Sequence, residues 1–479
     1  MPSKVSAVIK NKHFLSLSGN VIMSGLGMLT VAIIYRYLPV SDTGTWVFFS
    51  TTIVLIDSIR SGFLTTAFIK FYAGASPERA EDVAGSTWFV GICITGLLVL
   101  INIPFYFFVK QFHDQDYILL IRLFSICFVC MLPWFIGSCV IMGEQRFDKL
   151  LYIRLVNQGG FLVYIILLII FKKMSLSGVI FVYIFAHFVT SIFTLVKGWS
   201  RINTIGKRTK GTIAELYHFG KFSVGTSLSA NLWGFSDVFI IKTMLNDSAV
   251  AIFNLGQNFM QAVEILLRSF AATAMPSLST AFNSTEKDSV IYVMKKYVGM
   301  VTFMLIPIVI LGLLLANIPI QLVGGGKWAG TVAGIQAANT FRFFLVFALL
   351  YPADRFFALT LDVINKPKLN FYKLLVMLAT NIIFDVLGIK LFGNIYGIAV
   401  TTVMPILVGV IIGYWALNKY NKFSFWDVYS VGYTESKALL IQTWQKFRPQ
   451  KASVSGPSSE PDDHHDDVQI APKKCDEGN

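Results

Sequence analysis

The stretch VLIDSIRSGFLTTAFIKF, residues 54–71, decides how the rest of the sequence is interpreted. It is apolar enough to cross a bilayer, yet it carries Asp57 and Arg60 one helical turn apart. A charge in the hydrocarbon core costs about 2.5 to 3.5 kcal/mol or more, so ionisable residues there normally face a partner or a water-filled cavity. If this segment spans a membrane, the pair therefore marks a candidate site.

The composition indicates a membrane protein with many spans. Of 479 residues, 55% are hydrophobic and only 14% are charged, whereas an ordinary soluble domain is about a quarter charged. The mean hydropathy is +0.64. The first apolar stretch is longer than the core of a signal peptide, so we expect it to be retained as a span. We expect about twelve transmembrane helices, near residues 14–38, 46–70, 85–109, 117–141, 153–171, 176–197, 219–244, 249–275, 290–316, 336–361, 371–392 and 395–418.

The distribution of basic residues gives an orientation. With twelve spans, both termini lie on one side, and up to Lys422 that side receives 22 lysines and arginines against eight on the other. Basic residues concentrate in cytoplasmic loops, so we expect cytoplasmic termini. This distribution also explains the net charge of +13 without nucleic acid, and it favours contact with anionic membrane lipids.

The sequence repeats itself. IIYRYLPVSDTGTWVFF (33–49) is echoed by IIKTMLNDSAVAIFNL (240–255), and KKMSLSGVIFVY (172–183) by LFGNIYGIAVTT (391–402). Two six-helix lobes follow, and because six is even, the pseudo-two-fold axis between them runs along the membrane normal. We therefore expect an all-α fold with an N-terminal lobe at 1–197, a cytoplasmic linker at 198–218 and a C-terminal lobe at 219–418.

The remaining chain divides into a juxtamembrane segment, 419–456, and an acidic tail, 457–479. In ESKALLIQTWQKFR (435–448), apolar residues share one helical face, as in a helix that lies on a membrane surface. The tail has seven acidic and two basic residues and almost no apolar run, so we expect it to be disordered. Its DDHHDD, 462–467, is either a metal-binding tract or a solvated low-complexity tail.

Two acid–arginine pairs form the candidate substrate site. Asp57 and Arg60 lie in the second span, and Glu264 and Arg268 in the eighth, each pair on one helix face. Guanidinium groups suit phosphate oxygens. If the spans face each other, the two arginines would meet in a water-reachable cleft that opens to the cytoplasm and receives a pyrophosphate. The alternative is that each pair only neutralises itself and helps helices to pack.

Other ionisable and ligand-type residues are weaker candidates. Asp237, in the seventh span, either faces the cavity or bonds neighbouring helices. Cys127 and Cys130 form a CxxC, which has two interpretations: a metal or redox pair, or packed cysteines. We expect His187 to be a packing residue. GGGKWAGT (324–331) lacks the phosphate-loop pattern. We therefore expect no catalytic residues, no metal and no cofactor, and any uphill work must come from an ion gradient or from substrate turnover.

Several stretches resemble the polysaccharide transporter family, the O-antigen-type oligosaccharide-lipid flippases of the superfamily that also holds multidrug and toxin extrusion antiporters and lipid II flippases. The stretches are RYLPVSDTGTWVFF (36–49), SDVFIIKTMLNDSAVAIFNLGQNF (236–259), MPSLS (275–279), LVGGGKWAGTVAGIQ (322–336) and LATNIIFDVLGIKLFGNIYGIAVTT (378–402). The expected count of about twelve spans differs from the fourteen spans of the lipid II flippases, so the resemblance does not extend to lipid II as the substrate.

The resemblance implies a bacterial cytoplasmic-membrane protein whose first, second, seventh and eighth spans line a cationic cavity. Such proteins move an undecaprenyl-pyrophosphate-linked oligosaccharide to the outer leaflet by alternating access, coupled to a proton or a sodium ion. The product feeds surface polysaccharide assembly (O-antigen, lipopolysaccharide or exopolysaccharide), with a polysaccharide polymerase or other assembly proteins as partners. Arg60 and Arg268 fall on the implied cavity-lining spans.

Two alternatives remain open at this stage. A multidrug or cation antiporter of the same fold would favour a lumen of unpaired acids and aromatics. A membrane glycan polymerase or glycosyltransferase would need a substantial outward loop for its active site, and the outward loops here are mostly short.

Overall fold

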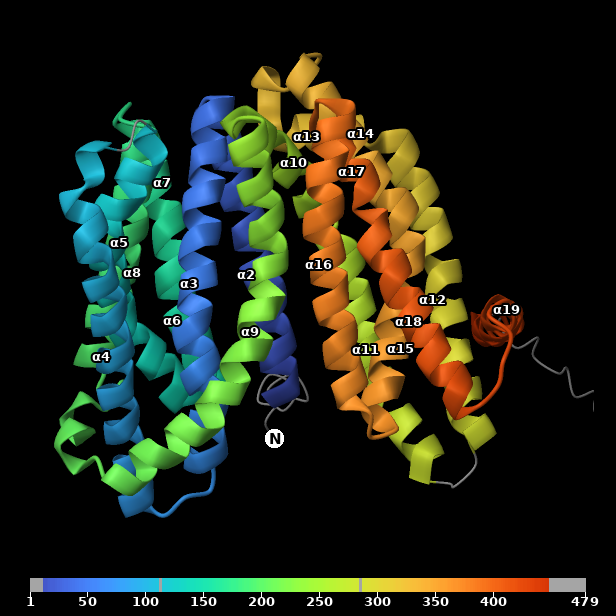
Figure 1. The fold of residues 1–479 in the computed structure, drawn as a ribbon, viewed down its shortest axis with the longest axis horizontal. Coiled ribbons are helices and arrows are strands. Elements are labelled where there is room, and N and C mark those ends of the chain that lie inside the picture. Colours follow the sequence, from blue (N-terminus) through green and yellow to red (C-terminus); the bar gives the residue numbers. More distant parts are fainter. Residues whose placement is uncertain (1–11, 112–113, 284–286, 448–479) are drawn as a thin grey trace, which may run out of the picture. The chain divides into compact units, whose positions relative to one another are not determined.

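The computed structural model describes residues 12–111, 114–283 and 287–447, and within these ranges the chain is helical with no strand. The compact body that contains the spans ends at Glu435. Figure 1 shows the helices standing side by side. In the N-terminal half they are α2 (Lys12–Tyr37), α3 (Val40–Tyr72), α4 (Pro77–Phe107), α5 (Gln115–Gly143), α6 (Phe147–Arg154), the π-helical η2 (Leu155–Gly159), α7 (Gly160–Ile170) and α8 (Leu176–Val196).

The C-terminal half repeats this arrangement. Its helices are α9 (Lys210–Met244), α10 (Asp247–Phe259), α11 (Gln261–Asn283), α12 (Lys287–Leu315), α13 (Asn317–Gly324), α14 (Val332–Phe347), α15 (Tyr351–Val363), α16 (Pro367–Phe392), α17 (Ile395–Thr401), α18 (Val403–Tyr420) and α19 (Asp427–Phe447). Short 3₁₀ turns stand at Val109–Gln111, Ile202–Lys207, Gly325–Lys327 (η4) and Ala348–Leu350. The all-α fold with two lobes is confirmed.

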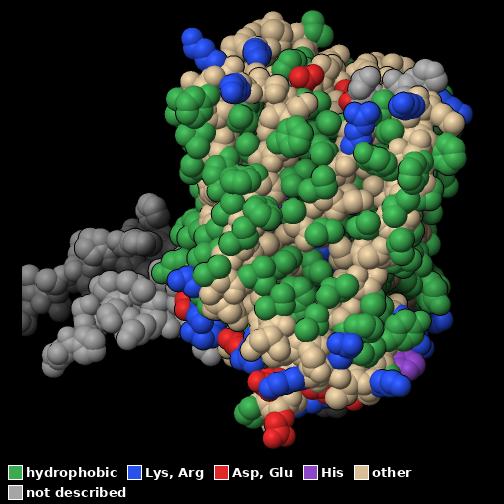
Figure 2. Space-filling view, turned by 90° about the vertical axis from the view of Figure 1, so that its left-hand side faces the viewer, with side chains coloured by type: hydrophobic (Ala, Val, Ile, Leu, Met, Phe, Trp, Pro, Cys, Tyr) green, Lys and Arg blue, Asp and Glu red, His purple; other side chains and the backbone are tan. Residues whose placement is uncertain are grey.

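Ten helical stretches of the described chain are long and apolar enough to cross a membrane. The two remaining expected spans correspond to α2, whose apolar part is the shorter Ile22–Tyr37, and to α9, which is 35 residues long but more polar. The surface agrees with a membrane setting, because Figure 2 shows hydrophobic side chains over the middle of the molecule and basic and acidic ones at its two ends.

Side-chain caps fix several helix starts. The side chains of Ser76, Ser175 and Asn246 each accept a hydrogen bond from a backbone N–H of the first turn that follows. Thr209 does the same for α9, so that helix begins at Lys210 and not near residue 219 as the apolar pattern predicts. The predicted linker 198–218 therefore includes the first turns of α9.

The two lobes meet along α3, which packs against α9 and α10. At the end of the molecule that is uppermost in Figure 1, where α2 turns into α3 and α9 into α10, the backbones come very close. A Cβ placed on Gly44 would lie 1.7 Å from the carbonyl oxygen of Asp247. Only glycine permits this crossing, so the lobes are tightly joined at this upper end.

The segment before α9 is fastened to the N-terminal lobe. Asp82 of α4 accepts hydrogen bonds from the N–H and hydroxyl of Thr209 at 2.9 and 3.0 Å, and from Thr212 Oγ1 at 2.6 Å. Trp88 Nε1 donates to the carbonyl oxygen of Ser200 at 2.6 Å. Farther along, a Cβ on Gly62 of α3 would lie 2.6 Å from the Cβ of Ser227 of α9. The lower part of α9 thus belongs structurally with the N-terminal lobe.

Candidate functional site

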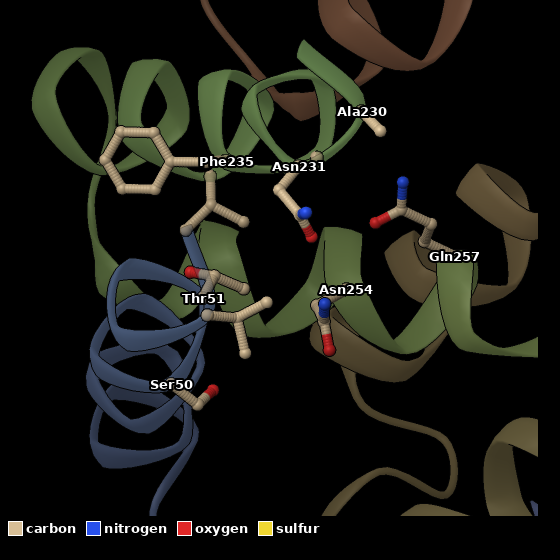
Figure 3. A pocket seen from close by; sticks show the side chains of 10 residues that line it. Ser50, Thr51, Ala230, Asn231, Phe235, Asn254 and Gln257 are labelled. Carbon is tan, nitrogen blue, oxygen red and sulfur yellow. The ribbon is translucent and has the colours of Figure 1, made fainter. Parts of the chain in front are cut away.

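A pocket of about 250 Å³ lies between α3, α9 and α10, at the contact between the lobes. Its walls are Ser50, Thr51, Val54, Ala230, Asn231, Gly234, Phe235, Val238, Asn254 and Gln257. Figure 3 shows the amide groups of Asn231, Asn254 and Gln257 gathered around one space, with Ser50 and Thr51 of α3 beside them. None of these ten described residues carries a formal charge, so the pocket is polar but neutral.

The pocket lies below the tightly joined upper end. Ser50 follows Gly44 by six residues along α3, and Asn254 follows Asp247 by seven along α10, which at 1.5 Å per residue places the pocket about 10 Å farther down. Tyr35 of α2 donates its hydroxyl hydrogen to the carbonyl oxygen of Ala251 (3.1 Å) or to Asn254 Oδ1 (3.2 Å). A side chain from the N-terminal lobe thus holds a pocket residue of the C-terminal lobe.

Above the pocket, an ionic cluster connects the lobes. The Nζ atom of Lys242, at the end of α9, contacts Asp116 of α5, lies 2.6 Å from Asp247 Oδ1 and lies 3.5 Å from Asp114 Oδ2. The Lys242 side chain is only 4% exposed and lies over the ring of Phe48. We call Lys242, Asp116, Asp247 and the Gly44 crossing the upper closure.

The predicted pair in the N-terminal lobe is enclosed. Arg60 has no exposed side-chain surface, and its Nη2 lies 2.5 Å from Asp57 Oδ1. Its Nη1 donates to Thr95 Oγ1 of α4 at 3.2 Å and to the carbonyl oxygen of Phe128 of α5 at 3.1 Å. The guanidinium also lies 5.1 Å from the ring centre of Phe135. Every one of these partners belongs to the N-terminal lobe.

The predicted pair in the C-terminal lobe is open. Arg268 Nη2 lies 2.7 Å from Glu264 Oε2, and the two side chains are 72% and 49% exposed. The expectation that Arg60 and Arg268 share a water-reachable cleft is therefore wrong for Arg60 in this conformation, because α4 and α5 surround its head group completely. The substrate-binding role of the two pairs stays a prediction.

A polar stripe leads from the pocket to Arg268. Asn258 Nδ2 donates to Asn254 Oδ1 at 2.9 Å, and Gln261 Nε2 donates to Asn258 Oδ1 at 3.3 Å. Beyond the break at Met260, Glu264 and Arg268 follow Gln261 along α11 at the same spacing of three or four residues. Both side chains are exposed, so the series of polar residues that begins at the pocket residue Asn254 ends at an accessible guanidinium.

Asp237 is buried in the C-terminal half and forms no hydrogen bond or ion pair with Arg60 or Arg268 among the described residues; its partners lie on α16. Asn381 Nδ2, from α16, donates to Asp237 Oδ1 at 2.6 Å and to Asp385 Oδ2 at 3.0 Å. The Oδ1 atoms of Asn381 and Asp385 are buried and have no hydrogen-bond partner in the described chain. Two buried carboxyl groups that share one amide donor, with one carboxyl oxygen unpaired, need a proton or a cation nearby, because an unpaired buried carboxylate is very costly.

The remaining sequence candidates are packing residues in the described chain. His187 Nδ1 lies 2.9 Å from Asn157 Nδ2, and its ring stacks on Trp134 at 5.5 Å. Cys127 is buried, and both it and Cys130 are free thiols. Among the described residues, no group of three or more His, Cys, Asp or Glu could hold a metal ion. The DDHHDD tract and the acidic tail lie outside the described residues.

Sequence reasoning missed the pocket. Asn231, Asn254 and Gln257 were within predicted spans, but none was singled out, because a neutral amide in an apolar helix is as typical of helix packing as of a site. The signal was their repetition: Asn254, Gln257, Asn258 and Gln261 follow one another at helical spacing.

Comparisons with solved structures identify the fold. The lipid II flippase MurJ in an inward closed conformation matches with a TM-score of 0.71 and 13% identity, over 91% of this chain and 94% of that one. An inward-facing multidrug resistance MATE family transporter of the MOP superfamily matches with a TM-score of 0.69 and 14% identity, over 88% of this chain and all of the other. A MOP superfamily transporter from Pyrococcus furiosus gives 0.58 and 14%, over 88% and 98%.

Sequence comparison identifies the family. No curated protein sequence matches this chain. A family profile described as polysaccharide biosynthesis protein does match it, over residues 9–282, which is more than half of its length. That range includes the enclosed pair, the pocket and the polar stripe as far as Arg268. The chain therefore belongs to the polysaccharide biosynthesis protein family, and its fold is similar to those of the lipid II flippase and the MATE transporter.

Proposed function

We propose that the protein is an alternating-access flippase that carries a lipid-pyrophosphate-linked oligosaccharide from the cytoplasmic to the outer leaflet of a bacterial cytoplasmic membrane, for surface polysaccharide assembly. The observation that carries the proposal is the polar stripe, which leads from a pocket beneath the upper closure to the exposed Arg268. The family and the lipid flippase among the similar folds support the same class of cargo.

The orientation follows from the loops. The lower end in Figure 1 carries the loop between α3 and α4 and the segment between α8 and α9, which belong to the side with the basic excess. That end is therefore cytoplasmic, and the upper closure faces outward. In this conformation a pyrophosphate would reach Arg268 from the cytoplasm, where a guanidinium can bind its oxygens in a bidentate manner.

We also propose that an ion gradient drives the cycle through Asp237, Asn381 and Asp385. The three side chains supply carboxylate and amide oxygens, which are the donors that a hard monovalent cation prefers and that can equally hold a proton. Binding there changes the charge buried between α9 and α16. Because α9 also lines the pocket, this site is well placed to influence the lobe contact.

Reconstitution tests the proposal directly. Purified protein in vesicles, given undecaprenyl pyrophosphate that carries a fluorescent tetrasaccharide, should move the labelled head group across the bilayer faster than protein-free vesicles, as measured with an impermeant quencher. A sodium or proton gradient should accelerate the movement, and Asp385→Asn should remove that dependence. Absence of lipid movement together with gradient-driven efflux of a cationic dye would instead identify a drug antiporter. A lengthened glycan would identify an enzyme.

A further inference from the structure

We propose that the pocket between α3, α9 and α10 is a subsite for an uncharged sugar of the cargo, separate from the phosphate contact at Arg268. This inference rests on the proposed flippase function and adds a division of the binding face into two parts. The neutral part is built from amides and hydroxyls at the outward end, and the charged part is the arginine nearer the cytoplasm.

The unused hydrogen-bonding groups of the pocket match those of a sugar. Asn231 Nδ2 donates one hydrogen bond to the carbonyl oxygen of Ser227 at 2.9 Å, which leaves its second N–H as a donor and its Oδ1 as an acceptor. Asn254 Oδ1 is occupied by Asn258 and Tyr35, which leaves its Nδ2 as a donor. The carboxamide of Gln257 has no side-chain hydrogen bond in the described chain. Sugar hydroxyls donate and accept at once, so they can satisfy both kinds of group.

The hydroxyls of α3 extend this pattern on the opposite wall. Ser50 Oγ donates to the carbonyl oxygen of Val47 at 3.1 Å, and Thr51 Oγ1 donates to the same oxygen at 2.8 Å. With their hydrogens used, both oxygens face the pocket only as acceptors. Val54 and Phe235 supply the apolar part of the wall. A few fixed polar groups on a partly apolar wall is the usual composition of a small-molecule site.

The absence of charge among the ten lining residues sets the selectivity. A carboxylate that entered this pocket would lose water and find no cation in the lining, which is unfavourable. A neutral hydroxyl or acetamido group loses far less. The pocket volume of about 250 Å³ also restricts the site to a small part of the glycan.

The geometry orients the cargo. Gln257 and Arg268 are eleven residues apart, which at 1.5 Å per residue corresponds to about 16 Å, with a helix break at Met260 between α10 and α11. A pyrophosphate at Arg268 therefore leaves the sugar chain to extend outward along Gln261 and Asn258 into the pocket. The Tyr35–Asn254 bond must break when the lobes part at the upper end, so outward opening would disturb the sugar contact directly.

The decisive experiment compares two cargoes in vesicles: undecaprenyl pyrophosphate with a neutral tetrasaccharide, and undecaprenyl pyrophosphate without sugar. Gln257→Leu keeps the size of the side chain and removes two unpaired hydrogen-bonding groups. We expect it to lower the transport ratio of glycosylated to bare cargo by about tenfold, because each lost hydrogen bond counts for about threefold to tenfold. Gln336→Leu, a half-buried glutamine of α14 outside the pocket, is the matched control and should keep the ratio.

A second comparison in the same vesicles uses an acidic cargo, in which the tetrasaccharide consists of uronic acids. The wild-type protein should transport it more slowly than the neutral cargo, and Gln257→Lys should narrow that difference. Equal losses for both cargoes in Gln257→Leu, no loss for either, or wild-type preference for the acidic glycan would each overturn the sugar subsite while leaving the flippase function intact. If the wild-type protein moves neither lipid, the flippase function itself fails.

Discussion

The two acid–arginine pairs have nearly the same sequence context and opposite surroundings. Asp57–Arg60 is enclosed by α4 and α5, so that the guanidinium makes three kinds of polar contact and has no exposed surface. Among the described residues, Glu264 and Arg268 bond only to each other, and both side chains are largely exposed. The difference teaches that a repeated acid–arginine pair can be a buried packing element in one lobe and an exposed ion pair in the other.

The cause lies in what packs around the two helices. α3 has α4, α5, α9 and α10 against it, while α11 packs mainly on α12 and α15. A charged head group on α3 therefore needs partners within the lobe, and Thr95 and the Phe128 carbonyl supply them. The head group of Arg268 remains available to an anion. The following predictions separate these two roles, from the largest expected effect to the smallest.

Replacing Arg60 should have the largest effect on stability. Arg60→Ala leaves the Asp57 carboxylate without its cation inside the lobe, and breaking a buried pair costs about 3–5 kcal/mol. We expect a correspondingly lower free energy of unfolding, measured by denaturation of the purified protein in detergent. Arg268→Ala, the matched variant in the other lobe, should change it by less than about 1 kcal/mol. Equal losses in the two variants would contradict the contrast.

Replacing Arg268 should have the larger effect on binding. Charge-assisted hydrogen bonds contribute about 1.5–3 kcal/mol, so Arg268→Ala should weaken binding of undecaprenyl pyrophosphate by about tenfold to a hundredfold. Arg268→Lys keeps the charge but loses the bidentate geometry, and should recover part of the affinity. Binding is measured by calorimetry on folded protein. If Arg60→Lys abolished binding and Arg268→Ala left it unchanged, the phosphate contact would lie in the N-terminal lobe and this prediction would be wrong.

A third prediction concerns the upper closure, where a substitution at Gly44 should move the two lobes apart. Gly44→Ala places a Cβ where the Asp247 carbonyl stands, and because backbone cannot move aside locally, α3 and α10 should separate. Spin labels at Ser41 and Gly326 should report a longer distance in Gly44→Ala than in the parent protein. Gly96→Ala is the control, since no atom lies within 4 Å of its added Cβ. An unchanged distance would show that the closure tolerates the methyl group.

The ion pair between Glu435 of α19 and Lys296 of α12 should have the smallest effect. Glu435 accepts hydrogen bonds from Lys296 Nζ at 2.5 Å and from Tyr292 at 2.6 Å, and these lower its pKa. A carboxyl group whose pKa is lowered in the folded state stabilises the protein at pH values above its unfolded pKa of about 4.3. This stabilisation is lost as the pH falls through the folded pKa. Since the pair is close to solvent, Glu435→Gln should cost less than about 1 kcal/mol at pH 7 and progressively less as the pH falls below the unfolded pKa. Detergent denaturation at both pH values checks this.

Much of the fold was predictable because it rests on local patterns. Apolar length, helix-terminal residues and the internal repeat predict the spans and the two lobes. The surroundings of Arg60 were not predictable, because they depend on Thr95 and Phe128 from other helices, and a spacing of three residues says nothing about which side of a helix is enclosed. The neutral pocket likewise forms only where three helices meet. In the sequence alone, its amide residues cannot be distinguished from ordinary helix-packing residues.

The fastening of α9 to the N-terminal lobe has a mechanical consequence. Residues 200–212 are held to α4 through Trp88 and Asp82, and Gly62 and Ser227 interlock beyond them. Only past this interlock does α9 reach the Asn381 contact of the C-terminal lobe. If one lobe moves against the other, as proposed, residues 200–212 cannot act as a flexible linker because they are bound to α4. The bending would then occur inside the helix, between Ser227 and Asp237, and this segment also supplies Ala230, Asn231, Gly234 and Phe235 to the wall of the pocket.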